Sequence, residues 1–153
     1  MNKEKSIEVL NTLIEINNDR IEGYETASKE TKDSDLKTLF SHLIKTSENC
    51  KKELSAEVQK LGGEPIEGTK ISGSFFRAWM DVKAALTGND RKTILNSCEI
   101  GEDVAVDTYN KALKNNLEDI TTEQQTMLIR QYALIKADHD RIKNLRDTLV
   151  EYK

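Results

Sequence analysis

Four polar side chains interrupt the apolar stripes of four helical segments: Asn17, Ser47, Glu102 and Asp138. An ionised carboxylate such as Glu102 is costly inside a core unless it is paired or binds a metal ion. Helical bundles that hold two metal ions use one Glu from each of two helices and a Glu-x-x-His from each of the other two. Residues three apart on a helix face the same way, so both side chains of that motif reach the metals. The four polar positions are therefore the places in this sequence where metal ligands would be expected.

The acidic and imidazole side chains at or beside these positions are the candidate metal ligands: Glu102, His139, Glu48 and Asp138. The set is an incomplete version of the di-metal pattern. Glu102 has the place of a ligand on the third segment, but its counterpart Asn17 is neutral and a poor ligand. In the fourth segment His139 is present, while Lys136 stands where the motif has Glu. A lysine there places positive charge where metals need negative charge, which argues against a full di-iron site.

Two interpretations of this polar layer remain open. In the first, Lys45 and Lys136 neutralise the carboxylates in a buried layer of ion pairs, which sets helix register more than stability. No cofactor is then expected. In the second, a single iron or other divalent metal ion is held by Glu102 and His139 with Glu48 or Asp138. Nearby, Glu99 and Asp103 form an acidic turn, and His42 flanks its stripe; we interpret all three as parts of solvated helix faces.

Long amphipathic segments must position these residues. Apolar side chains recur at alternating steps of three and four over about residues 3–30, 34–61, 90–115 and 122–151, which predicts four helices with a left-handed bundle seam. The chain has 33% charged and 5% aromatic residues and one proline, a composition typical of long helices. We therefore expect an all-α protein with one domain over residues 1–153.

The connections predict the topology. Short links after the first and third segments make antiparallel neighbours. Gly62-Gly63 ends the second segment, and the crossover over residues 62–89 contains a short helix at about 75–86. The apolar face of that helix carries Phe75, Phe76, Trp79 and Val82. Two antiparallel hairpins joined by one long crossover define a ferritin-like four-helix bundle.

Composition narrows the function classes. The net charge of −4 is spread along the chain without a basic run, so nucleic acid is not an expected partner. No signal core and no long apolar run occur, so we expect a cytoplasmic protein without a membrane partner. Cys50 and Cys98 lack C-x-x-C spacing and are interpreted as small buried apolar residues. No nucleophile triad or phosphate loop occurs, which favours a protein that is not an enzyme.

Several stretches carry a resemblance to a known family: Leu61-Gly62-Gly63-Glu64-Pro65, Trp79 with Asp81 and Lys83, Gly101-Glu102-Asp103, and His139-Asp140. Over nearly its whole length the chain resembles a bacterial family of ferritin-like four-helix-bundle proteins of unknown function. The resemblance implies the fold and no activity. We expect a non-enzymatic bundle that acts through self-association, as a homo-oligomer, or through protein contacts. The alternative is an iron-binding ferritin-like protein with a degenerate di-metal site.

Overall fold

The structure, a computed structural model, describes residues 2–68, 80–84, 86 and 91–151. Within these residues it has four long α-helices, a single 3-10 turn and no strand. The elements are α1 (Lys3–Glu30), α2 (Ser34–Lys60), α4 (Arg91–Asn115), η1 (Leu117–Asp119) and α5 (Thr122–Glu151). The all-α prediction is confirmed, and the helix ends agree with the predicted ones to within one residue.

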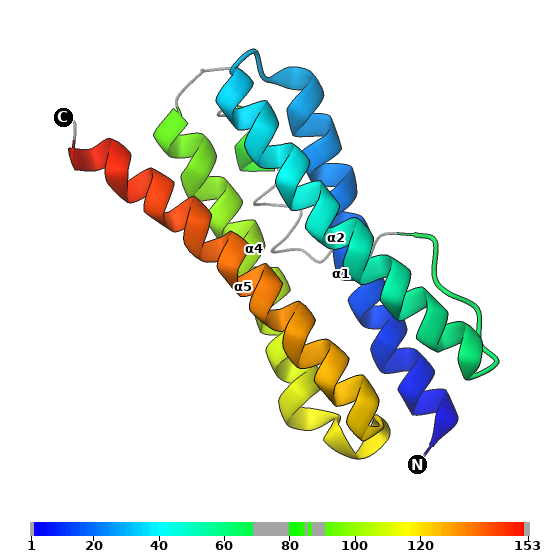
Figure 1. Cartoon of the computed structure of the whole chain (residues 1–153). Helices are drawn as coiled ribbons and strands as arrows, with labels where there is room; N and C mark the ends of the chain where they lie inside the picture. Colours follow the sequence, from blue (N-terminus) through cyan, green and yellow to red (C-terminus); the bar gives the residue numbers. More distant parts are fainter. Residues whose placement is uncertain (1, 69–79, 85, 87–90, 152–153) are drawn as a thin grey trace.

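The long helices pack as two antiparallel hairpins (Figure 1). α1 packs chiefly on α2, and α4 packs chiefly on α5, while contacts between the two hairpins are sparser. Figure 1 shows that α2 and α4 begin at the same end of the bundle, so these two helices run parallel. The predicted long crossover therefore joins the hairpins.

Side chains cap three of the helices. Oδ1 of Asn2 accepts hydrogen bonds from the backbone at the start of α1. Oδ1 of Asp33 does the same for α2, bonding the amide of Asp35 at 2.9 Å. Thr121 and Gln124 form a reciprocal capping box, with each side chain bonding the backbone N–H of the other residue at 3.0 Å.

A glycine turn ends α2. Gly62 has φ of 84°, in the left-handed region that favours glycine. The N–H of Gly63 donates to the carbonyl of Val58, and the N–H of Gly62 to that of Gln59, both at 3.0 Å. This is the Schellman pattern that closes a helix C-terminus. The predicted end of the second helix is therefore confirmed, together with its cause.

Polar side chains of α1 fasten the start of the crossover. Asn11 accepts a hydrogen bond from the N–H of Ile66 at 3.0 Å and donates to the carbonyl of Glu64. Asn18 donates to the carbonyl of Gly68 at 2.8 Å. These contacts explain why α1 is buried over more of its surface than the single stripe that the periodicity predicts.

The described part of the crossover helix is residues 80–84 and 86. Val82 is buried there and packs in the core with Tyr24 and Phe40. This helix therefore packs onto the bundle at Val82. The predicted apolar residues Phe75, Phe76 and Trp79 lie outside the described residues. In the described part of the chain, none of the helices has the combination of length and apolarity needed to cross a membrane.

Among the residues that the structure describes, the core consists of two hydrophobic clusters. The first includes Leu13, Leu54 and Ile135, and the second includes Tyr24 and Ile142. In α2, α4 and α5 a single buried polar residue separates the two clusters: Ser47, Glu102 and Asp138. In α1 the separation is a run of four buried polar residues, from Asn17 to Arg20. A polar layer therefore lies between the clusters and draws one or more side chains from each helix.

Replacing Gly62 with Ala should lower the free energy of unfolding by about 1 kcal/mol, because a residue with a Cβ is strained at positive φ. Gly68→Ala is the matched control, since a Cβ at Gly68 meets no atom within 4 Å. Urea unfolding of both variants measures the difference. Equal stability of the two variants would refute the role given to the glycine turn.

Candidate functional site

A fully buried arginine lies at the centre of the polar layer. Nε and Nη2 of Arg20 donate to Oε2 and Oε1 of Glu102 at 2.7 and 2.6 Å. Nη2 also donates to Oδ2 of Asp138 at 3.2 Å, and Nη1 donates to the hydroxyl of Ser47. Because these residues come from α1, α4, α5 and α2, a single guanidinium joins all four long helices.

The electrostatics of this layer favour a permanently charged arginine. Burial by itself lowers the pKa of Arg20, but the charge and hydrogen bonds of Glu102 outweigh it and raise that pKa above its usual value. The guanidinium also lies over the ring of Tyr24, 5.9 Å from its centroid. Tyr24 in turn stacks on Phe40, and burial raises the pKa of Tyr24 well above its usual value. Both groups therefore keep their protonated forms at neutral pH.

The layer reaches solvent on the α2 side. Nε2 of His42 lies 3.1 Å from Oδ1 of Asp138, and the His42 side chain is 49% exposed. Arg20 contributes one positive charge, while Glu102 and Asp138 contribute two negative charges, so these three paired groups sum to −1. The sequence analysis interpreted His42 as part of a solvated helix face. In the structure His42 instead borders the polar layer, on the side where the excess negative charge is located.

The predicted neutralising role of the lysines is wrong. Lys45 is exposed, and Nζ of Lys136 lies 2.9 Å from Asp140 on the surface of α5. Arg20 supplies the charge instead, because its planar fork binds one carboxylate through two parallel hydrogen bonds. The sequence did hold a signal: Arg20 is four residues before buried Tyr24. The neighbouring apolar residue Ile21 is only partly buried, so apolar periodicity alone points away from Arg20.

A second polar chain lies beside the arginine layer. Nδ2 of Asn17 donates to the hydroxyl of Tyr109 at 2.9 Å, and that hydroxyl donates to Oε1 of Gln131 at 2.8 Å. Nε2 of Gln131 continues to Glu53 of α2 at 3.1 Å. Asn17, predicted as a degenerate ligand position, is thus a hydrogen-bonding residue in this chain, and burial keeps the pKa of Tyr109 well above its usual value.

The four predicted metal ligands do not converge on one point. Glu102 and Asp138 meet only through the guanidinium of Arg20. Glu48 is exposed on α2. His139 faces away from the layer: its Nε2 lies 2.6 Å from Oδ1 of Asp103, and its Nδ1 lies 3.0 Å from Oδ1 of Asp140.

The structure instead gathers a different ligand set. Glu99, Asp103 and His139 each place one potential ligand atom within 4.8 Å of those of the other two. No other group of three such residues occurs in the described part of the chain. Nη1 of Arg146 contacts Oε2 of Glu99. Hydrogen bonds from His139 and Lys136 lower the pKa of Asp140 below its usual value. The imidazole of His139 therefore lies among three carboxylate side chains at the seam of α4 and α5.

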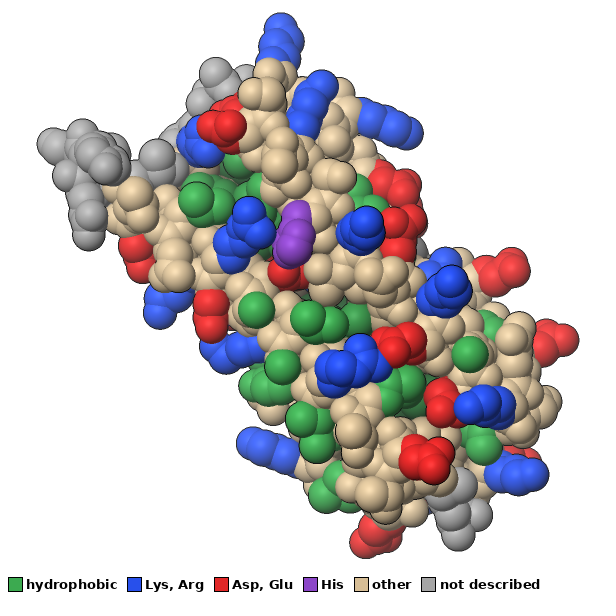
Figure 2. All heavy atoms as spheres, viewed as in Figure 1, with side chains coloured by type: hydrophobic (Ala, Val, Ile, Leu, Met, Phe, Trp, Pro, Cys, Tyr) green, Lys and Arg blue, Asp and Glu red, His purple; other side chains and the backbone are tan. Residues whose placement is uncertain are grey.

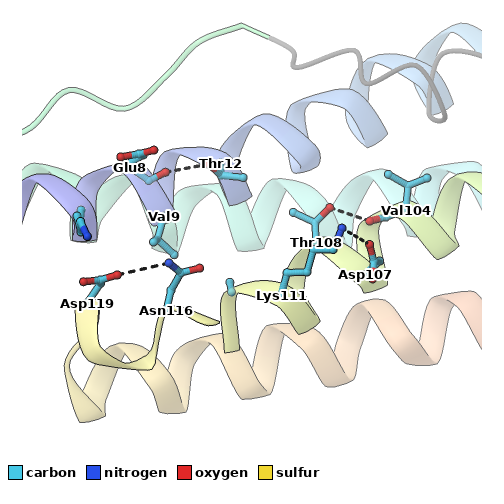
Figure 3. A pocket seen from close by; sticks show the side chains of 11 residues that line it. Glu8, Val9, Thr12, Val104, Asp107, Thr108, Lys111, Asn116 and Asp119 are labelled. Carbon is cyan, nitrogen blue, oxygen red and sulfur yellow. Dashed lines mark hydrogen bonds and ion pairs between the residues drawn. The ribbon is translucent and has the colours of Figure 1, made fainter. Parts of the chain in front are cut away.

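A shallow groove of about 510 Å³ lies between α1 and α4 (Figure 3). Its charged groups include Lys111 and Asp107, which pair with each other at 3.0 Å. The hydroxyls of Thr12 and Thr108 donate to carbonyls of their own helices. Because these groups are already engaged, we interpret the groove as the space left where α1 and α4 pack loosely.

The face formed by α2 and α5 carries charges of both signs. Figure 2 shows Lys and Arg side chains interspersed with Asp and Glu side chains, with hydrophobic side chains between them along the two helices. On this face the charges are mixed in space, as they are along the sequence.

Both cysteines are free and buried, as predicted. Burial raises the pKa of Cys50 to about 11 and that of Cys98 well above its usual value. Since the thiolate is the reactive form of cysteine, these thiols are inert components of the core.

Fold and site together define an all-α protein of four long helices whose centre is filled by a buried charged layer. Residues 5–115 match the model of a family described as a domain of unknown function (DUF2383), and the chain belongs to this family. The match includes Arg20, Ser47 and Glu102, whereas Asp138 and His139 lie beyond it. No curated protein matches the chain.

Replacing Arg20 with Met should lower the free energy of unfolding by about 3 to 5 kcal/mol, because Glu102 and Asp138 would be left buried without a counter-charge. Urea denaturation measures this loss. Arg130→Met is the matched control, since Arg130 pairs with Glu53 at the surface and should contribute below about 1 kcal/mol. Adding Glu102→Gln to Arg20→Met should recover part of the loss. A cost for Arg20→Met as small as that of the control would contradict the account.

Proposed function

We propose that this protein is a non-enzymatic, ferritin-like four-helix-bundle protein that acts through its surface, by self-association or contacts with other proteins. The observation that carries the proposal is the buried guanidinium of Arg20, which pairs with Glu102 and Asp138 in the layer where the sequence pattern predicted metal ligands.

The arginine competes directly with a metal ion for the central ligands. Both carboxylate oxygens of Glu102 accept hydrogen bonds from Arg20. A divalent cation bound to Glu102 would lie a few ångströms from a fixed positive charge, in an interior where water screens charge weakly. Arg20 is fully buried and crowded by Tyr24, so it cannot move aside without repacking the core. The arginine therefore acts as the resident cation of the layer.

The ferritin-like assignment is supported by the order of the hairpins and by the position of the layer. Two antiparallel hairpins are joined by one long crossover, the connectivity of ferritin-like bundles. Each long helix contributes to a polar layer at one level between two apolar clusters. In this proposal the layer keeps the geometry of a metal-binding ancestor and replaces its ions with an arginine.

The surface supplies groups suited to protein contacts. Ile129 and Leu134 of α5 are 57% and 44% exposed, and Ile100 of α4 is 49% exposed. Burying exposed aliphatic side chains of this size against another chain would contribute about 1 kcal/mol or more for each. The α4 and α5 hairpin is therefore the part of the chain that we assign to self-association or to contacts with other proteins.

The absence of ferroxidase activity is the first expectation to test. The purified, untagged protein should oxidise ferrous ion in air no faster than buffer does, because Arg20 occupies the central carboxylates. Absorbance after addition of one and two equivalents of ferrous ion measures this. An oxo-ferric band that appears in the wild type and is lost in Glu102→Gln would refute the proposal.

Self-association is the second expectation. Light scattering over a series of protein concentrations should give a mass above 17.4 kDa. Ile129→Asn with Leu134→Asn should shift the mass toward that of one chain, while Leu117→Asn, an exposed leucine in η1, serves as the control. A mass of one chain at every concentration would remove self-association from the proposal.

A further inference from the structure

We propose that Glu99, Asp103 and His139 form a surface site for one divalent transition-metal ion such as zinc, at the seam of α4 and α5. The site is separate from the buried layer and does not depend on the proposed function. Its ligand atoms already lie within 4.8 Å of one another in the described structure. One imidazole nitrogen with two carboxylate oxygens is a ligand set that zinc accepts.

Two helices hold these ligands in place. Glu99 and Asp103 are four residues apart on α4, so both project from the same face of the helix. His139 approaches them from α5. The side chains of His139 and Glu99 are only 13% and 17% exposed, whereas that of Asp103 is 59% exposed. The inner side of the site is thus buried by packed side chains, and its outer side is open to solvent, where water molecules can complete the coordination of a metal ion.

The orientation of His139 suits a ligand. Nδ1 lies 3.0 Å from Oδ1 of Asp140, so a proton on Nδ1 is donated to that carboxylate. The lone pair of Nε2 then points toward Asp103, on the side where the other ligands lie. A carboxylate that fixes the ring of a metal-binding histidine is a common arrangement and raises the basicity of the ligand nitrogen.

The charge around the imidazole favours a divalent cation. Its network of ion pairs contains four carboxylates, Glu99, Asp103, Asp140 and Asp147, and two cations, Lys136 and Arg146. With a neutral imidazole these groups sum to −2, which one divalent ion would balance. Arg146 contacts Glu99 through Oε2, so the second carboxylate oxygen can face the metal.

Binding needs the direct contact between His139 and Asp103 to open. Nε2 of His139 and Oδ1 of Asp103 are 2.6 Å apart, whereas two ligand atoms on one zinc ion are about 3 Å apart. The exposed Asp103 side chain can open by this amount. Without metal, a protonated imidazole can donate to Asp103 and Asp140 together, and a metal ion replaces the proton on Nε2, which is released to solvent.

Isothermal titration of the untagged full chain with zinc chloride tests this site. We expect one equivalent of zinc to bind the wild type, and at least tenfold weaker binding in Asp103→Asn and in His139→Gln. His42→Gln is the matched control, because the chain has only two histidines and His42 also contacts an aspartate. It should bind zinc like the wild type. Circular dichroism checks folding, and the exposed Asp103 provides a variant that leaves the core untouched.

Two outcomes would overturn the site. One is no zinc binding by the wild type, and the other is equal binding by all four proteins, which would indicate adventitious zinc. Proton NMR gives an independent readout: zinc should shift the imidazole signals of His139 and leave those of His42 in place. Because zinc does not undergo oxidation, this result stands apart from the ferrous-ion assay, so either proposal can fail without the other.

Discussion

One buried ion pair organises the molecule. The guanidinium of Arg20 reaches from α1 to a carboxylate of α4, a carboxylate of α5 and a hydroxyl of α2. Taking such charges out of water is expensive, and the cost is offset only when the geometry is closely kept. Sliding α1, α4 or α5 by one residue would leave a charge buried without its partner. The apolar clusters on either side supply the attraction between helices, and the ion pair selects the register in which they pack.

This constraint also explains how the two hairpins stay together. Contacts within each hairpin are extensive, while those between hairpins are sparse. Arg20 and Ser47 belong to one hairpin, and Glu102 and Asp138 belong to the other. The strongest polar interactions of the core therefore cross the boundary between the hairpins. The hydrogen bonds between Asn17, Tyr109 and Gln131 cross it a second time.

The sequence predicted the helices, the glycine end of the second helix, the long connection and the existence of a polar layer, because periodicity and turn chemistry are local signals. The sequence did not predict which side chains pair with one another in the polar layer, since this pairing depends on how each helix is rotated about its axis. Successive helical residues differ by about 100° in direction. Glu102 and Asp138 therefore point inward, while Asp103 and His139, one residue later on each helix, meet at the outer seam. A histidine predicted beside Glu102 lies beside Asp103 for this reason.

Nitrogen-15 NMR of the arginine side chains most directly tests whether Arg20 is the fixed cation of the core. Its Nε–H donates to Glu102 and is fully buried, so its signal should be resolved at neutral pH and exchange with water far more slowly than that of the surface residue Arg130. The signal should also shift in Glu102→Gln. An Nε–H of Arg20 that exchanges as fast as that of Arg130 would mean that the guanidinium is solvated, and that the layer joining the four helices does not exist.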